Sequence, residues 1–136
     1  MKNRTEIRDA DDTVLAYKIA GEWPEGLCPY SDDGDFVQVL SWNYEAGKRL
    51  RPHTHLPAPR DATHTQEVIV VLSGRLRADV FDQSRRLVAR TVLGPGESMV
   101  FLCGGHGYEV MEAGTRVLEV KNGPYPGPEA DRVRLD

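Results

Sequence analysis

Short stretches of β-branched, aliphatic and aromatic residues alternate with breaks rich in glycine, proline, asparagine and aspartate along most of the chain. Apolar runs of this length between such breaks are typical of β-strands. We expect little helix, because no long window shows an apolar repeat of three to four positions free of glycine and proline. The predicted strands are Thr13–Ile19, Phe36–Tyr44, Glu67–Ser73, Arg75–Phe81, Leu87–Leu93, Ser98–Leu102, Gly107–Met111 and Arg116–Lys121.

This pattern predicts an all-β fold. Many short strands at regular spacing favour an antiparallel sandwich or barrel over a parallel sheet with crossover helices. A chain of 136 residues suffices for one domain with its own core, so we expect a single domain over residues 1–136. Gly21–Asp35 and Asn122–Asp136 are rich in glycine and proline, and they are predicted to form irregular segments near the N- and C-terminal ends.

Charge and composition argue against several classes of function. The 21 acidic and 17 basic residues give a net charge of −4 without one long basic patch, so we expect no nucleic-acid partner. The longest apolar run, Val68–Leu72, is far shorter than a bilayer span, and Met1–Arg4 leads into charge. We therefore expect a soluble cytoplasmic protein without membrane contact, in which Cys28 and Cys103 are reduced thiols.

The histidines carry the most chemical information. All four lie in the middle of the sequence: His53, His55, His64 and His106. Residues two apart in an extended segment face the same side, so His53 and His55 can present both imidazoles to one point. Glu67 opens a predicted strand in phase with Ile69 and Val71. If that face is the inner one, the carboxylate needs a partner, because unpaired buried charge costs several kcal/mol, and a divalent cation is the simplest partner.

Two motifs surround these residues. Gly47, five further residues, His53-Thr54-His55, Glu67, six further residues and Gly74 follow one another in that order. Gly96, five further residues and the run Leu102-Cys103-Gly104-Gly105-His106 follow later in the chain. The sequence thereby resembles the cupins, small β-barrel proteins that bind a metal through a first motif of this kind and a second one with Pro-x-Gly before its histidine.

The match departs from the family at two places. Leu102 stands where the second motif has proline, and its histidine comes one place early. Eleven residues separate His55 from Glu67, whereas three or four are usual in the family, so Leu56–Gln66 would be an insertion. Because of this spacing, Asp61 or His64 is an alternative to Glu67 as the acidic or fourth ligand.

The resemblance covers about residues 36–120. It implies a jelly-roll barrel whose interior holds a divalent first-row metal ion, with Zn, Fe, Mn, Ni and Cu all open. The implied ligands are His53, His55, Glu67 and His106. Three short phrases are similar to a group of small bacterial cupins, some of them linked to surface-polysaccharide synthesis: Thr65–Val68, Gly104–Gly107 and Lys121–Tyr125.

Three imidazoles and one carboxylate would leave coordination positions open for water or substrate. We therefore expect a small polar ligand, a sugar or a carboxylic acid, with isomerisation, hydrolysis or O2-dependent oxidation as possible reactions. His64 and Tyr108 are the candidate catalytic acid–base residues, and Arg49 and Arg51 are candidates for binding an anionic ligand.

Two other interpretations stay open. The cavity of a non-catalytic binding or sensing module would bind the small molecule without turnover, and a purely structural protein would hold no metal on its histidines. Under all of these interpretations, the metal-binding one included, we expect a homodimer, because small β-proteins with exposed edge strands commonly pair.

Overall fold

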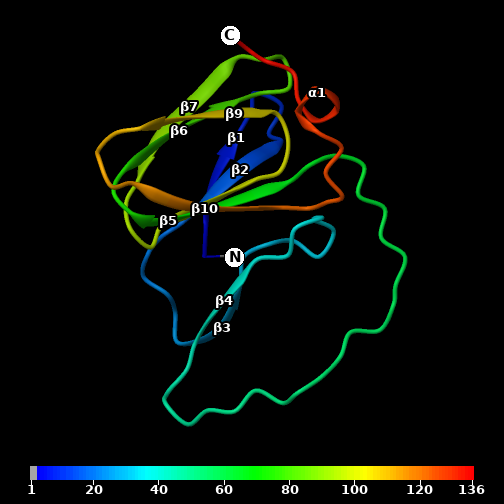
Figure 1. The fold of residues 1–136 in the computed structure, drawn as a ribbon, viewed down its shortest axis with the longest axis vertical. Coiled ribbons are helices and arrows are strands. Elements are labelled where there is room, and N and C mark those ends of the chain that lie inside the picture. Colours follow the sequence, from blue (N-terminus) through cyan, green and yellow to red (C-terminus); the bar gives the residue numbers. More distant parts are fainter. Residues whose placement is uncertain (1–2) are drawn as a thin grey trace.

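The computed structural model describes residues 3–136, and it confirms the all-β, antiparallel prediction (Figure 1). Its elements follow in chain order as β1 (Thr5–Arg8), β2 (Val14–Ile19), β3 (Gly26–Pro29), β4 (Leu40–Asn43), β5 (Glu67–Ser73), β6 (Leu76–Phe81), β7 (Leu87–Leu93), β8 (Ser98–Phe101), β9 (Gly105–Val110), β10 (Arg116–Lys121) and α1 (Pro128–Asp131). In this part of the chain, no helix has the length and apolar character needed to cross a membrane.

The strands form three antiparallel sheets. The largest has the order β1-β2-β8-β5-β10, the second has the order β7-β6-β9, and β3 pairs with β4 in a two-stranded ribbon. Within residues 3–136 these ladders stay separate, so the hydrogen-bonded strands do not close into one barrel. One edge of β10 and one edge of β9 are left without a neighbouring strand in the described sheets.

The main core lies between the five-stranded and the three-stranded sheet. Leu15, Ile69 and Met99 from the larger sheet pack in one cluster with Val80 and Leu93 from the smaller one, and all five are almost completely buried. Burial of each such side chain is worth about 1.5–3 kcal/mol. Apolar contact between the two inner faces therefore holds the sheets together.

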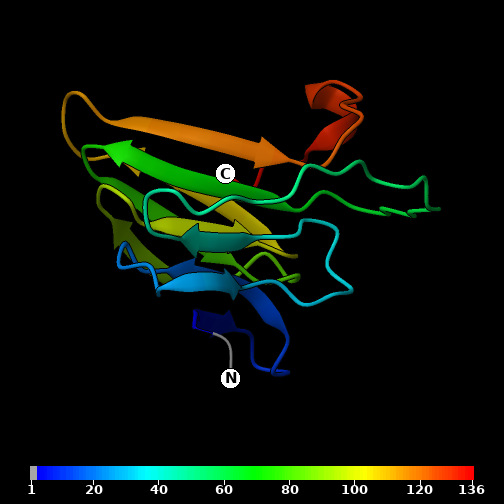
Figure 2. The ribbon, with the colours of Figure 1, turned by 90° about the horizontal axis from the view of Figure 1, so that it is seen from below.

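A second apolar layer covers the opposite face of the five-stranded sheet. Tyr17, Val68 and Val100 point to this outer face and pack against Tyr30 and Cys28 of the β3–β4 ribbon and its flanking segment. Figure 2 shows the ribbon in front of β8 and β2, with β5 and β10 beyond its edge. Strand β5 is apolar on both faces. Its inner face joins the main core, and on its outer face Val68 and Val70 pack at the edge of the second layer whereas Leu72 is exposed.

The core also uses residues outside the predicted 36–120 segment. Leu15, Tyr17 and Ile19 of β2 are buried, and so is Tyr30. Strands β1 and β3 form in stretches without a clear strand pattern, and β3 lies inside the predicted irregular segment Gly21–Asp35. Both strands are short. Strand β1 pairs with β2 and β3 pairs with β4, and the composition of a segment does not reveal such pairing.

The predicted strand Phe36–Tyr44 is too long, since only Leu40–Asn43 pairs as a strand. Side chains take the place of a neighbouring strand before it. Gln66 Oε1 accepts from the backbone N–H groups of Phe36 and Val37 at 2.8 and 3.2 Å, and Ser31 Oγ accepts from that of Val39 at 2.8 Å.

A long loop over residues 44–66 connects β4 to β5 and carries both His53 and His55. It contains no strand or helix, nearly all of it is exposed, and Figures 1 and 2 show it running far out from the sheets. In the described chain, no hydrogen bond joins residues 49–62 to the sheets, since the bond from this stretch runs within it, between His53 Nδ1 and Arg51 O (3.1 Å).

Gly74, the last glycine of the first motif, makes a testable case for backbone geometry. It has a φ of +84°, and an added Cβ would lie 2.5 Å from Thr115 Cα. Gly114 has a φ of +79° with nothing within 4 Å of an added Cβ. We expect Gly114→Ala to lose about 1 kcal/mol of unfolding free energy through strain alone and Gly74→Ala to lose roughly 3 kcal/mol or more, measured by urea unfolding. Equal losses in the two variants would contradict the crowding at Gly74.

Candidate functional site

Two acids are buried in the described chain, Asp79, which is paired with Arg77 and Arg90, and Glu67. Glu67 is the one at the end of the core. It is the first residue of β5 and lies between Phe101 of β8 and Lys121 of β10 in the register of the sheet. Only 5% of the residue is exposed, and it shares its face with Ile69 and Val71, so the predicted inner-face position is confirmed. The carboxylate therefore lies where the apolar core ends.

Two side chains of the opposite sheet contact this carboxylate. Nε2 of His106 lies 3.1 Å from Glu67 Oε2, and the Tyr108 hydroxyl donates to Glu67 Oε1 at 3.3 Å. Both residues lie on β9, two positions apart, and therefore point to the same side of that strand. A carboxylate oxygen only accepts, so the proton of this imidazole–carboxylate bond is on Nε2.

An aromatic wall flanks the contact. The Phe101 ring stacks on His106 with centroids 4.4 Å apart and meets the Tyr108 ring edge-on at 5.9 Å. Phe101 is buried, whereas 28% of the His106 side chain is exposed. The imidazole is thus fixed on one side by a ring and open to solvent on another.

A second carboxylate adjoins the first. Glu119 of β10 lies opposite Ile69 in the sheet, on the same inner side, where its exposed carboxyl group interacts with that of Glu67. Burial by itself would raise the pKa of Glu67, but the hydrogen bonds from His106 and Glu119, with the charge of Lys121 nearby, lower it to about 2. The bond to Glu67, together with burial, raises the pKa of Glu119. Glu67 is the anion of this pair, and Glu119 is the member that takes up a proton first.

Tyr108 is a proton donor held in its neutral form. Burial, followed by the charges of Glu67 and Glu119, raises the pKa of its phenol far above the usual range. Its ring is partly exposed, but its hydroxyl is directed at Glu67. Tyr108 and His106 thus contact the two oxygens of the same carboxylate.

The structure brings two of the four predicted metal ligands together. Glu67 and His106 are in contact, whereas His53 and His55 lie in the exposed loop with their rings 5.0 Å from each other. Asp61, the alternative acid, is exposed in the same loop. Within residues 3–136, no group of three or more His, Cys, Asp or Glu side chains is arranged to hold a metal ion.

His64 anchors the end of the loop. Its Nε2 lies 3.1 Å from the carbonyl oxygen of Leu102, which only accepts, and its ring contacts that of Phe36 at 4.8 Å. Asn122 adds to the anchor, because its Nδ2 donates to His64 O at 3.2 Å and its Oδ1 accepts from Gln66 N at 2.7 Å. The loop therefore leaves the body from a fixed base.

The C-terminal segment borders the same end of the sheets. An added Cβ on Gly105, the residue before His106, would lie 2.7 Å from Leu135 Cδ1. Thr65 Oγ1 donates to Asp131 Oδ1 at 3.2 Å, which ties α1 to the base of the loop. The segment after β10 thus crosses from the larger sheet to the start of β9.

Glu119 and Lys121 are residues of the candidate site that the sequence interpretation missed. The available signal was the alternation of Val117, Glu119 and Lys121 in the predicted strand Arg116–Lys121. It became informative only with the register, which places Glu119 opposite Ile69 and Lys121 opposite Glu67.

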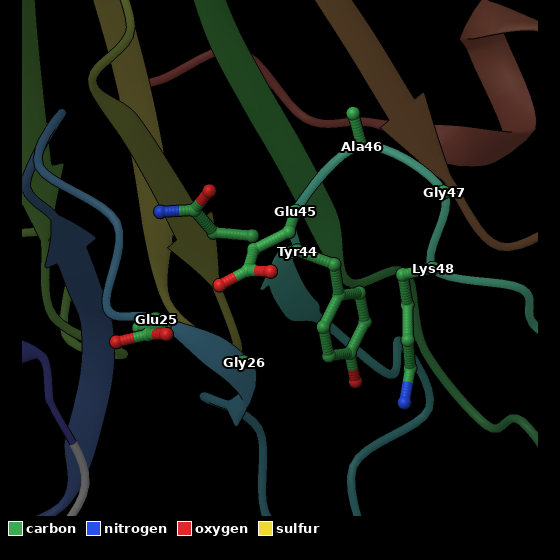
Figure 3. Close-up of a pocket in the computed structure, with 8 residues that line it drawn as sticks. Glu25, Gly26, Tyr44, Glu45, Ala46, Gly47 and Lys48 are labelled. Atoms are coloured by element: carbon green, nitrogen blue, oxygen red, sulfur yellow. The ribbon is translucent and has the colours of Figure 1, made fainter.

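A shallow hollow of about 510 Å³ lies elsewhere, at the turn after β4. Figure 3 shows its lining, in which the Tyr44 ring and the Lys48 side chain lie side by side and point the same way. Lys48 Nζ is 5.2 Å from the Tyr44 ring centroid, a cation–π contact. None of the residues that contact Glu67 lines this hollow.

No protein-family model matches this chain, and neither does any curated protein or any solved structure.

Because of Glu67, the free energy of unfolding should fall as the pH is lowered. Its pKa falls from 4.5 to about 2 on folding, so its stabilisation is fully present above pH 4.5 and is lost as the pH falls toward 2. We expect Glu67→Gln to lower the unfolding free energy at pH 7 by about 1–3 kcal/mol, and this difference from the wild type to shrink between pH 4.5 and pH 2.

Urea unfolding in the presence of a chelator measures this difference. Glu112→Gln is the matched control, because Glu112 is an exposed side chain after β9 and its loss should leave the unfolding free energy unchanged. A wild-type advantage over Glu67→Gln that stays constant from pH 7 to pH 2 would show that Glu67 is not ionised in the fold.

Proposed function

We propose that this protein binds a divalent first-row metal ion at Glu67 and His106, and that His53 and His55 complete the site when their loop folds against β9. The observation that carries the proposal is the buried carboxylate of Glu67 in contact with the imidazole of His106. The completed fold would be the jelly-roll barrel that the resemblance to cupins implies.

The chemistry of the donors supports a cation. Glu67 and Glu119 lie on neighbouring strands on the same side of the sheet, and two nearby carboxylates repel unless a proton or a cation lies between them. The Nε2 proton of His106 occupies the line between imidazole and carboxylate. A metal at both groups would require neutral imidazole with its proton on Nδ1 and an ionised carboxylate, so binding would weaken as falling pH protonates these donors.

The loop has the properties expected of a segment that completes this site. A connection of more than about 15 residues without secondary structure is uncommon in a compact domain and is usually functional. Leu56 is 84% exposed in it, and no hydrogen bond holds residues 49–62 to the sheets in the described chain. A different position of this stretch would therefore break few contacts.

Strand β9 offers the place where the loop would pair. It is the edge of the order β7-β6-β9, so one row of its backbone groups has no strand partner in the described sheets. Such an edge readily accepts a further strand. If residues near His53 and His55 paired there, both imidazoles would face one side, next to His106 on the same sheet.

Charge favours the same arrangement. The loop has four basic residues, Lys48, Arg49, Arg51 and Arg60, against two acidic ones, Glu45 and Asp61. The end of the sheets that it would cover presents Glu67 and Glu119. Attraction between a basic loop and an acidic opening would bring the histidines toward their partners.

A bound divalent ion would supply Lewis acidity and lower the pKa of a coordinated water. The residues of this chain would supply the rest. Tyr108 would hold or donate a proton beside Glu67, Phe101 would orient the His106 ring, and Arg49 or Arg51 would bind an anionic group of the ligand. His64, whose Nε2 is bonded to Leu102 O, would position the loop rather than exchange protons. A small sugar or carboxylic acid suits these groups.

Metal content tests the proposal. Untagged protein should hold about one equivalent of Zn²⁺ or Mn²⁺ by elemental analysis after dialysis, and His106→Ala or Glu67→Gln should lose it. The double variant His53→Ala/His55→Ala should weaken binding at least tenfold, because removal of ligands or of their supporting partners costs affinity on that scale.

Two substitutions in the same loop serve as controls. Thr54→Ala lies between the two histidines and Asp61→Asn removes the alternative acid, and both should leave metal content unchanged. On metal addition, the amides of residues 50–56 and of β9 should gain protection from hydrogen exchange together. Undiminished metal binding in His53→Ala/His55→Ala, or a loop that stays unprotected, would refute the completed site.

A further inference from the structure

The outer face of the five-stranded sheet leaves large apolar side chains uncovered. Leu118 and Val120 of β10 lie opposite Val70 and Val68 of β5 in the register and point outward with them. About half of each side chain is exposed, as is Leu72 at the end of β5. This strip begins where the β3–β4 ribbon ends (Figure 2).

The ribbon continues the apolar surface. Its Cys28 and Ser41 face the sheet, so the alternate residues Leu27, Leu40 and Trp42 face away from it. Leu27 and Trp42 are direct partners across the ribbon, and each of them is more than half exposed. We call the six exposed residues the outer apolar face: Leu27, Leu40, Trp42, Leu72, Leu118 and Val120.

The chain as a whole exposes more surface than a monomer of its mass. It presents 9712 Å². A monomeric protein of 15.2 kDa exposes about 7,100 Å². The excess exceeds the roughly 800 Å² that each partner buries in a standard interface. The long loop contributes to the excess, and the outer apolar face contributes the part that is least favourable in water.

We propose that a second copy of this chain covers the outer apolar face, so that the protein is a homodimer. The six residues of this face are uncharged, so none of them would select a partner of opposite charge or lose water as an unpaired ion on contact. A two-fold axis brings the same patch of both copies together, which makes an apolar surface self-complementary. The free edge of β10 beside it adds unpaired backbone groups to the contact.

The loop over residues 44–66 is a poorer occupant for this face. Its basic residues favour the acidic opening at Glu67 and Glu119, and its large aliphatic side chains are few. Dimer formation on the outer apolar face does not depend on the metal, because the face lies on the opposite side of the sheet from Glu67.

Sedimentation equilibrium of the full chain tests the dimer. Between 1 and 100 µM, with chelator present, the mass should rise to twice the 15.2 kDa of one chain. Leu118→Lys should weaken dimerisation more than tenfold and give the mass of one chain over this range. Leu87→Lys on β7 is the matched control, since Leu87 is about as exposed as Leu118 but lies on the other sheet.

Trp42→Lys gives a second variant on the ribbon should Leu118→Lys fail to fold, and far-UV circular dichroism reports folding of each. In the unmodified protein, the amides of β10 should become more protected from hydrogen exchange as the concentration rises. A wild-type mass of one chain at 100 µM would overturn the proposal, and so would a dimer that both Leu118→Lys and Trp42→Lys leave intact. If the loop over residues 44–66 covered the outer apolar face instead, the protein would have the mass of one chain at 100 µM.

Discussion

The removal of the Glu67 carboxylate from water is the constraint on which the arrangement of the two main sheets depends. An ionised group in this position costs several kcal/mol unless donors reach it. The donors come from the other sheet, where His106 and Tyr108 approach within 3.1 and 3.3 Å. Apolar packing holds the sheets together along most of their length, but at this end a charged hydrogen-bond network fixes their separation.

The polar end has a geometric effect on the rest of the molecule. Because Glu67, Glu119 and Lys121 occupy the inner face of β5 and β10, the apolar core cannot extend to the ends of these strands. The sheets therefore remain open there, and solvent reaches the His106 side chain. An opening with a fixed anion and a fixed imidazole is a general arrangement for binding cationic or polar ligands.

The fold follows from the sequence where a strand carries its own signal. Strand β5 was predicted with its observed bounds, because its unbroken β-branched run is a strong strand signal, and the phase of Glu67 with Ile69 and Val71 placed the acid correctly. Strand β1 and strand β3 escaped prediction because their stability comes from the strands that pair with them.

The candidate site was predictable only in part for the same reason. The predicted strand Gly107–Met111 included Tyr108 but began after His106, whereas the observed strand Gly105–Val110 carries both, and their meeting with Glu67 agrees with its inner face. Glu119 joins them through the register of β10 with β5, which depends on contacts between residues far apart in the chain. The spacing of His53 and His55 indicates how they face each other but not where a long connection carries them.

The contact of Leu135 with Gly105 has a practical consequence for how this protein is prepared. It brings the end of the described chain to the residue before His106. A polyhistidine tag fused after Asp136 would begin close in space to that imidazole. It would compete with the native side chains for any added cation. An N-terminal fusion would enter the molecule next to β1, at the far edge of the larger sheet from β10.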